Sequence, residues 1–205
     1  MKPTLLFITG TDTGVGKTTF AALLTRHLRA DGVRVAALKP VCSGGRGDAH
    51  ALREAAGKVL PLEEVNPWHF RAALSPLLAA RKEKKRVRLR EVVAHIRRVA
   101  KRFEVVVVEG AGGLLSPLGE DFDSRDLIQA LAATPIIVCP NKLGAVNQVR
   151  LVLGALPKAA ARRASIILVN PARPDAASRT NLGVLKKFVE PDRLGIMPWL
   201  RVKPR

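Results

Sequence analysis

The sequence predicts an α/β fold, in which a doubly wound, mostly parallel sheet lies between two layers of helices. Short apolar runs alternate with helical patterns from one end of the chain to the other, which indicates βαβ units. Several of these runs are nearly unbroken Val and Ile, as is typical of strands buried on both faces. Because crossovers between parallel strands are right-handed, helices should cover both faces of the sheet.

Six strands are expected, each from a short apolar run that ends at a polar, Gly or Pro residue. In chain order they are Thr4–Thr9, Val33–Leu38, Glu104–Glu109, Pro135–Cys139, Ser165–Asn170 and Leu194–Met197. In an open parallel sheet the ligand lies at the carboxyl ends of the strands.

Six helices are expected from amphipathic patterns between these runs. They are Thr18–Ala30, Ala49–Ala56, Leu89–Arg102, Arg125–Ala133, Ala145–Leu156 and Arg179–Val189. Gly32 closes the first of them, since a helix commonly ends at a glycine.

The length of 205 residues, 47% of them hydrophobic, suits one domain over residues 1–205. No apolar stretch approaches the ~18 residues of a membrane span, so no membrane is expected as a partner. The first apolar run leads straight into a glycine-bearing loop, unlike a signal peptide. Cys42 and Cys139 have no metal-ligand spacing and are expected to be reduced thiols of a cytoplasmic protein.

The net charge is +18, which suits either a nucleic-acid binder or a solvated, Arg-rich surface with anionic substrates. Aromatic residues make up only 4% and none is Tyr, so no platform for stacked bases is evident. The second interpretation is therefore favoured, and nucleic acid is not expected as a partner. The densest charge run, Arg81–Arg90, is interpreted as a solvated loop that enters a helix.

A phosphate-binding loop follows the first strand, with the sequence ITGTDTGVGKTT at residues 8–19. In this strand–loop–helix order, backbone N–H groups face the phosphates, Lys17 neutralises them and the Thr18 hydroxyl can bind Mg²⁺. The loop predicts ATP or GTP binding and a fold like that of the P-loop NTPases. Asp12 stands where plasmid-partition ATPases carry a signature lysine, which disfavours that family.

Two polar residues follow the second strand. Lys39, fixed by Pro40, would place a cation over the terminal phosphate or a carboxylate, or it is a surface lysine at a strand end. Asp48, further along, is interpreted from its position alone as a helix N-cap.

Glu109 ends an apolar strand and runs into Gly110, where a carboxylate is typical of those that bind Mg²⁺ in phosphate-loop enzymes. A structural acid there would be costly to bury unpaired. Asn170 could hydrogen-bond to the edge of a purine base, or it could belong to a turn. Trp199 could line the binding site of the base, or it could pack in the core.

Together these residues resemble the dethiobiotin synthetase family. The similar segments occur in the family's order along nearly the whole chain: TGTDTGVGKT (Thr9–Thr18), KPVCSG (Lys39–Gly44), GDAHAL (Gly47–Leu52), NPWHF (Asn66–Phe70), SP (Ser75–Pro76), VEGAGGLLSPL (Val108–Leu118), KLGAVN (Lys142–Asn147) and MPWL (Met197–Leu200).

The resemblance implies a ligase of biotin biosynthesis, in which 7,8-diaminononanoate, CO₂ and ATP give dethiobiotin, ADP and phosphate. In the family, one amine traps CO₂ as a carbamate, and the γ-phosphoryl group converts it to a carbamic-phosphoric anhydride. The second amine then closes the cyclic urea. The resemblance also implies a homodimer with its substrate site near the subunit interface.

The site residues that the resemblance implies fall into four groups. Lys39, Lys17 and Thr13 would be catalytic, and Thr18, Asp48 and Glu109 would bind Mg²⁺. ATP would contact Gly14, Val15, Gly16, Lys17, Thr18, Thr19, Asp48, Glu109, Gly110, Ala111, Gly112, Asn170, Pro171, Pro198, Trp199 and Leu200. The substrate would contact Ser43, Gly113 and, from the partner chain, the helix N-terminus at Gly144, Ala145, Val146 and Asn147.

Two other functions remain as alternatives: another P-loop synthetase, or a partition-type ATPase. A nucleotide-switched nucleic-acid binder is a third hypothesis, which the charge alone motivates.

Overall fold

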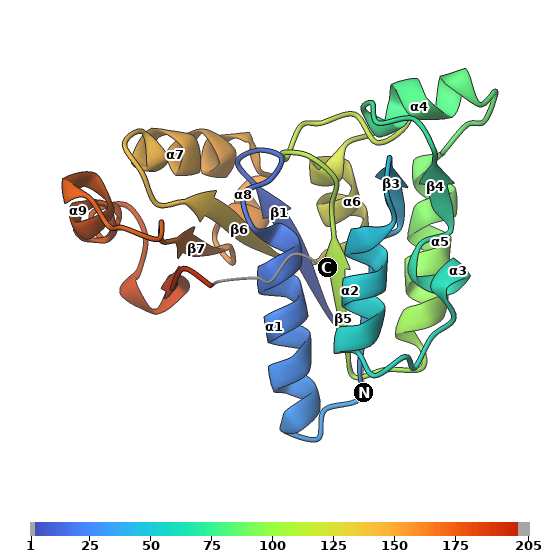
Figure 1. Cartoon of the computed structure of the whole chain (residues 1–205), viewed down its shortest axis with the longest axis horizontal. Helices are drawn as coiled ribbons and strands as arrows, with labels where there is room; N and C mark the ends of the chain where they lie inside the picture. The colour runs from blue at the N-terminus through green and yellow to red at the C-terminus, as the bar shows by residue number, and fades with distance from the viewer. Residues whose placement is uncertain (1–2, 201–205) are drawn as a thin grey trace.

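The computed structural model describes residues 3–200, and its main element is a six-stranded sheet in the order β2-β5-β1-β6-β7-β8 (Figure 1). Every neighbouring pair of strands is parallel. The six expected strands are confirmed, with ends shifted by at most two residues. Their bounds are β1 Thr4–Gly10, β2 Val35–Leu38, β5 Val105–Glu109, β6 Thr134–Pro140, β7 Ser165–Val169 and β8 Leu194–Met197.

The strand order places β1 in the middle of the sheet, between β5 and β6. Ile8 of β1 pairs with Glu109 of β5, and Gly10 pairs with Val138 of β6. Since parallel strands end at the same edge, the loop after β1 and the glycines after β5 emerge side by side.

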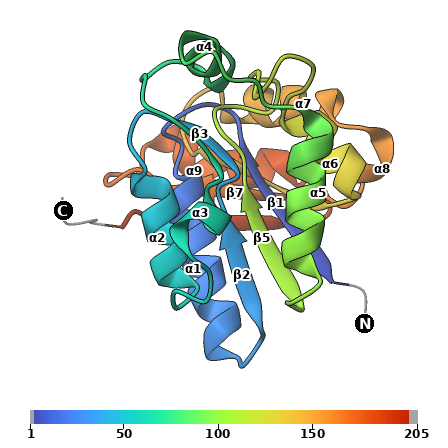
Figure 2. The same cartoon turned by 90° about the vertical axis from the view of Figure 1, so that its right-hand side faces the viewer.

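Helices cover both faces of the sheet, which gives the expected three layers (Figure 2). Apolar side chains alternate along β1, so that Ile8 packs in the core under α1 and α2, and Phe7 packs in the larger core under α5 and α6. The six expected helices are confirmed: α1 Lys17–Ala30, α2 Gly47–Ala55, α5 Leu89–Ala100, α6 Ser124–Leu131, α7 Ala145–Ala155 and α9 Ala176–Leu185.

Helix α9 begins three residues before the expected Arg179 and ends four before Val189. The reason is the N-cap: the Asp175 carboxylate accepts a 2.7 Å hydrogen bond from the backbone N–H of Ser178. Asp123 caps α6 in the same way within a capping box, so that α6 begins one residue before the expected start.

The sequence did not predict several short elements. The strands β3 Val41–Ser43 and β4 Trp68–Phe70 form a separate parallel pair. The short helices are α3 Leu62–Val65, α4 Pro76–Lys82, α8 Lys158–Ala161 and the 3₁₀ turn η1 Pro191–Arg193.

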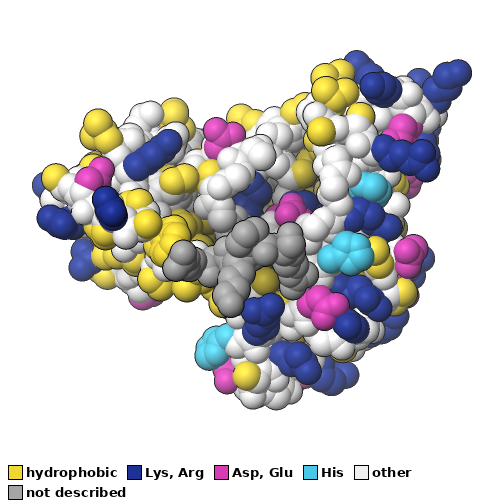
Figure 3. Space-filling model, in the orientation of Figure 1, with side chains coloured by type: hydrophobic (Ala, Val, Ile, Leu, Met, Phe, Trp, Pro, Cys, Tyr) yellow, Lys and Arg dark blue, Asp and Glu magenta, His cyan; other side chains and the backbone are white. Residues whose placement is uncertain are grey.

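The interpretation of Arg81–Arg90 as a loop is wrong for its first two residues. Arg81 and Lys82 form the last turn of α4, because Pro76 at the first helical position favours a helix start there. Lys and Arg side chains gather over α4 and the loop after it, at the upper right of Figure 3. Arg81 pairs with Glu120 at 2.6 Å.

Both cysteines are buried and free, as expected. Within residues 3–200, no helix combines the length and the apolar character that crossing a bilayer requires.

Candidate functional site

The carboxyl ends of β1, β2 and β5 border a pocket of about 830 Å³. Most of the residues predicted for phosphate, metal and catalysis line it, although they are up to 99 positions apart in the sequence. These residues are Thr13, Gly14, Gly16, Lys17, Thr18, Thr19, Lys39, Ser43, Asp48, Glu109, Ala111 and Gly112.

The phosphate loop is shaped by two glycines with positive φ. Gly14 has φ of 72° and Gly16 has φ of 99°, values that favour glycine over other residues. Gly16 is also the N-cap of α1, a helix with neither a side-chain cap nor an acidic residue in its first turn. The backbone N–H groups at this end of α1 are therefore available to an anion.

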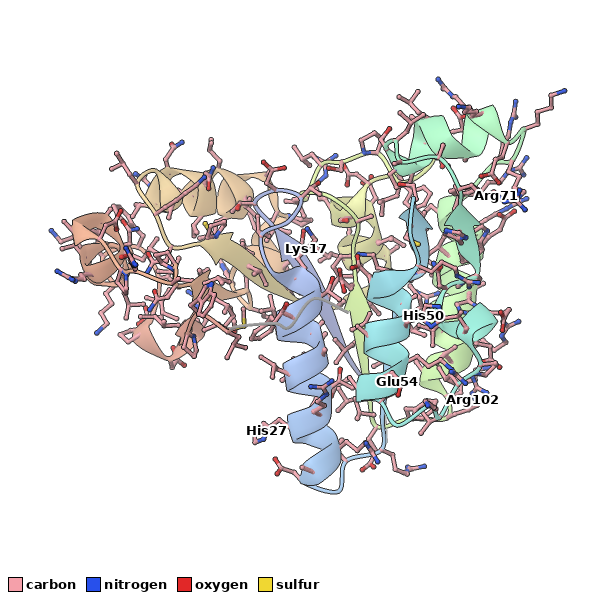
Figure 4. The ribbon with its side chains drawn as sticks, viewed as in Figure 1. Lys17, His27, His50, Glu54, Arg71 and Arg102 are labelled. Carbon is pink, nitrogen blue, oxygen red and sulfur yellow. The ribbon has the colours of Figure 1, made fainter. Side chains whose placement is uncertain are left out.

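Lys17 lies at the upper end of α1, whereas His27 lies toward the opposite end of the same helix (Figure 4). The Lys17 side chain is buried, and its Nζ donates a 2.7 Å hydrogen bond to the carbonyl oxygen of Asp12. Burial and the neighbouring Lys39 ammonium lower the pKa of Lys17 to about 8. A phosphate group would favour the charged form of this lysine.

Lys39 is only 3% exposed, so its interpretation as a surface lysine is wrong. Its Nζ lies 2.5 Å from Glu109 Oε1 and 2.9 Å from Asp48 Oδ2. It also donates a 3.1 Å hydrogen bond to the carbonyl oxygen of Gly110. Burial alone would lower the pKa of Lys39, but the two carboxylates outweigh it and hold that pKa above its ordinary value.

Glu109 is almost fully buried at the end of β5. Its Oε1 accepts hydrogen bonds from Lys39 and, at 2.8 Å, from the Thr18 hydroxyl. Its Oε2 has no hydrogen-bond partner among the residues that the structure describes. Burial and the Asp48 charge raise the pKa of Glu109 even though Lys39 opposes them.

Asp48 is the second residue of α2, and Arg46 is the N-cap, so the N-cap interpretation of Asp48 is wrong. Its side chain is half-exposed and points to Lys39. Burial would raise the pKa of Asp48, but the Lys39 ammonium outweighs it and keeps that pKa below its ordinary value.

The residues present fit Mg²⁺ that is shared with a nucleotide. Within residues 3–200, no group of three or more His, Cys, Asp and Glu could hold a metal ion by itself. Mg²⁺, however, is usually bound through one or two carboxylates together with substrate phosphates and water. Glu109, with its unpartnered buried Oε2, Asp48 and the Thr18 hydroxyl form such a partial set of ligands.

The opposite wall of the pocket was missed by the sequence prediction. It comes from the loop after β4 and the start of α4. Residues of β3, of the loop after β3 and of the loop after β5 complete it. The Ser43 hydroxyl donates a 2.5 Å hydrogen bond to the carbonyl oxygen of Leu74, which ties the two walls together. The available signals for this wall were the SP segment and the KPVCSG and VEGAGGLLSPL segments, which contain Cys42 and Ser116. The residues of the wall are Cys42, Gly45, Ala73, Leu74, Ser75, Pro76 and Ser116.

The residues predicted to hold the base lie beside the phosphate loop and outside this pocket. A Cβ at Gly16 would lie 3.4 Å from Val169 and 3.5 Å from Met197, so β7 and β8 end against the loop. Trp199 is 49% exposed, which makes its interpretation as a core residue wrong. Pro198 and Leu200 are exposed as well, and Pro171 is half-buried.

Asn170 is held by a network of amides that the sequence did not reveal. Its Oδ1 accepts a 2.7 Å hydrogen bond from Asn141 Nδ2, and Asn141 Oδ1 accepts one of 2.9 Å from Asn181. Asn141 is 1% exposed. Within residues 3–200 the side-chain N–H groups of Asn170 donate to no other residue.

Seven other predicted residues do not line the pocket either. The Val15 side chain packs in the core. The carbonyl oxygen of Gly110 accepts a hydrogen bond from Lys39. Gly144 is the N-cap of α7, which has neither a side-chain cap nor an acid in its first turn. The remaining residues, Gly113, Ala145, Val146 and Asn147, lie next to these backbone turns.

Comparison with known proteins gives close relatives along almost the whole chain. A family model described as an AAA domain matches residues 4–203. The chain is 41% identical to the ATP-dependent dethiobiotin synthetase BioD of Anaeromyxobacter dehalogenans (strain 2CP-C), over 95% of this chain and 89% of that protein. It is 34% identical to the ATP-dependent dethiobiotin synthetase BioD of Bacillus subtilis (strain 168), over 95% and 87% of the two chains.

Solved structures share the fold at low identity. A plasmid partition protein of Borrelia burgdorferi B31 bound to AMPPNP superposes with a TM-score of 0.60 at 13% identity, over 98% of this chain and 89% of that one. A ParA family ATPase of Chlorobium tepidum TLS gives 0.59 at 14% identity, over 98% and 86%. These likenesses support the P-loop α/β fold alone.

Proposed function

The chain belongs to the dethiobiotin synthetase family, and on that basis we propose that it carboxylates 7,8-diaminononanoate with CO₂ and closes the product to dethiobiotin. Enzymes of this family are ATP-dependent carbon–nitrogen ligases of biotin biosynthesis. The observation that carries the proposal is the meeting of Lys17, Lys39 and two carboxylates in one pocket.

The reaction has three steps in this proposal. One substrate amine adds to CO₂ and loses a proton, which gives a carbamate. A carbamate oxygen then takes the γ-phosphoryl group of ATP, and ADP leaves. The second amine attacks the carbonyl carbon of this anhydride and expels phosphate, so that the cyclic urea closes.

The protein contributes positioning and charge to these steps rather than covalent chemistry. Lys17 and the free N–H groups of the loop bind the phosphates. Lys39 and Thr13 bind the carbamate, and Ser43 contacts the diamine. Their places in one pocket support an approach of the carbamate to the terminal phosphate.

Thr18, Asp48 and Glu109 would hold Mg²⁺. When bound there, the metal would neutralise charge on the phosphate oxygens. The unpartnered Oε2 of Glu109 supports this assignment, because a buried carboxylate oxygen without a partner is costly.

Asn170 would contact the adenine, with Pro171, Pro198, Trp199 and Leu200 around the base. Support comes from the free N–H groups of Asn170 and from the position of β7 and β8 against the loop. The triphosphate would then run from these strands across α1 to Lys17.

We propose a homodimer in which α7 of one chain faces the substrate site of the other. Leu143, just before α7, is 85% exposed, and Leu151 on α7 is 64% exposed. Contiguous exposed apolar patches mark contact surfaces, and in this proposal Leu143 and Leu151 belong to such a patch. The uncapped N-terminus of α7 next to Leu143 would suit the substrate carboxylate.

ADP release tests the proposed function. It should require both 7,8-diaminononanoate and bicarbonate, with dethiobiotin formed in equal amount. Lys39→Ala should abolish it and leave nucleotide binding largely intact, since the phosphate loop is untouched. A partition-type ATPase would release ADP at the same rate without the diamine, and that result would overturn the proposal.

A further inference from the structure

The Lys39 ammonium has no N–H group left for a ligand. It carries three donors, and three oxygens lie within hydrogen-bond distance of it: Glu109 Oε1 at 2.5 Å, Asp48 Oδ2 at 2.9 Å and the Gly110 carbonyl at 3.1 Å. Two of these acceptors are the carboxylates that fit Mg²⁺. Lys39 therefore fills the space between the two metal-binding carboxylates with a positive charge of its own.

This arrangement conflicts with the role of Lys39 in catalysis unless one contact is released. To bind a carbamate, Lys39 must free at least one N–H group. The contact to Asp48 is the one that can open, because the Asp48 side chain is half-exposed near the start of α2, whereas Glu109 is 1% exposed.

We propose that Lys39 and a divalent cation compete for Asp48 and Glu109, so that Lys39 acts as an internal counter-ion until metal and nucleotide occupy the site. The inference rests on the proposed function of the same pocket. In the free protein, Lys39 neutralises the carboxylates and makes them poor metal ligands. When the cation takes over these carboxylates, Lys39 becomes free to bind the carbamate.

The electrostatics of the surrounding residues favours such competition. Lys17 also lies within electrostatic reach of Lys39, so two ammonium groups already oppose a third cation in the empty pocket. Phosphate groups bound at Lys17 would offset that charge. Metal binding is therefore expected to be weak without nucleotide, and the affinity to be limited by Lys39 itself.

The test is a titration of the nucleotide-free protein with Mn²⁺. The electron paramagnetic resonance signal of free Mn²⁺ measures how much of the metal is bound. Lys39→Met should bind Mn²⁺ about tenfold or more tightly than the unaltered protein, since it removes a charge in contact with both ligands. Lys101→Met is the matched control, because this exposed lysine follows α5 at the opposite edge of the sheet. It should leave the affinity unchanged.

The double variant Lys39→Met with Asp48→Asn should lose the gain, which identifies Asp48 as one of the ligands. If Lys39→Met binds Mn²⁺ no more tightly than the unaltered protein, or if the double variant keeps the gain, the competition is refuted. If Lys39→Met is unfolded without metal, Mn²⁺ should restore its thermal transition. No restoration by Mn²⁺ refutes the competition equally.

These results separate this inference from the proposed reaction. Dethiobiotin formation by the unaltered protein with no change of Mn²⁺ affinity in Lys39→Met would overturn the competition alone. Tighter Mn²⁺ binding in an enzyme that makes no dethiobiotin would support the competition and overturn the reaction.

Discussion

The side-chain amide of Asn66 donates a 2.7 Å hydrogen bond to the main-chain carbonyl of Lys39. Its Oδ1 accepts a 3.1 Å hydrogen bond from Arg46 Nε, and Arg46 is the N-cap of the helix that carries Asp48. One buried amide thus links the segment that bears Lys39 to the segment that bears Asp48.

Asn66→Ala should therefore disturb the Lys39–Asp48 contact without touching the phosphate loop. We expect a loss of about 1–3 kcal/mol in the free energy of unfolding, because the Lys39 carbonyl is left without this buried partner. We also expect kcat to fall while the KM for ATP stays nearly constant. Urea unfolding and steady-state kinetics measure both. Gln129→Ala, on the exposed surface of α6, is the control, and a rise in the KM for ATP with kcat unchanged would contradict the prediction.

The Lys39–Glu109 ion pair should show strong coupling in a double-mutant cycle. Lys39→Met leaves a buried carboxylate charge at Glu109 and should destabilise the metal-free protein by about 3–5 kcal/mol. Adding Glu109→Gln removes that charge and should restore part of the loss. The measurement is urea unfolding in EDTA, and simple additivity of the two single effects would rule out the coupling.

Nucleotide affinity should fall as the pH rises through about 8. In the proposed function Lys17 binds phosphate in its charged form, and its pKa of about 8 means that the free protein loses this proton above that pH. The Kd for ADP should then rise up to tenfold per pH unit above 8, with uptake of protons on binding. Calorimetry in buffers of different ionisation enthalpy measures both quantities. Lys17→Arg stays charged and should remove this pH dependence; a dependence kept in that variant would point to another group.

Asn170 should discriminate between bases through its N–H groups. Asn170→Asp keeps an oxygen for Asn141 but lacks those donors, so the Kd for ADP should rise about tenfold, the equivalent of one hydrogen bond of about 1.4 kcal/mol. The Kd for GDP should change little. Calorimetric titration of both nucleotides is the measurement, and equal changes for ADP and GDP would mean that Asn170 does not read the base.

Leu143→Glu should dissociate the proposed homodimer, because it would bury a charge in an apolar contact. Light scattering after gel filtration should give twice 22.1 kDa for the unaltered protein and 22.1 kDa for the variant. Val184→Glu, an exposed site on α9, should remain dimeric. A monomeric unaltered protein would refute the dimer.

The sequence predicted the elements that have a strong local pattern. The Val105–Val108 run forms a strand because it is buried on both faces, and the glycines and Lys17 define the phosphate loop without tertiary information. Lys39 and Glu109 could be placed at strand ends for the same reason.

Other parts depend on contacts between distant segments and carry no such pattern. The strands β3 and β4 have three residues each, too few for a period to show, and β3 pairs with a segment 27 positions away. The pocket wall at Leu74 depends on where that pair places the following loop. In the amide network, Asn141 lies 29 positions from Asn170 and 40 positions from Asn181. No local motif spans such separations.

The central place of β1 in the sheet has a consequence for how the site opens. Glu109 belongs to β5 and the residues that lead into the phosphate loop belong to β1, and we expect these interior strands to open only with the sheet itself. The pocket wall at Ala73 to Pro76 instead follows β4, which belongs to the separate β3–β4 pair outside that sheet. We therefore expect amide protons of β1 to exchange with solvent only through global unfolding and those of this wall through local opening. Accordingly, we expect the side of the pocket at this wall to open more readily than the side at the phosphate loop.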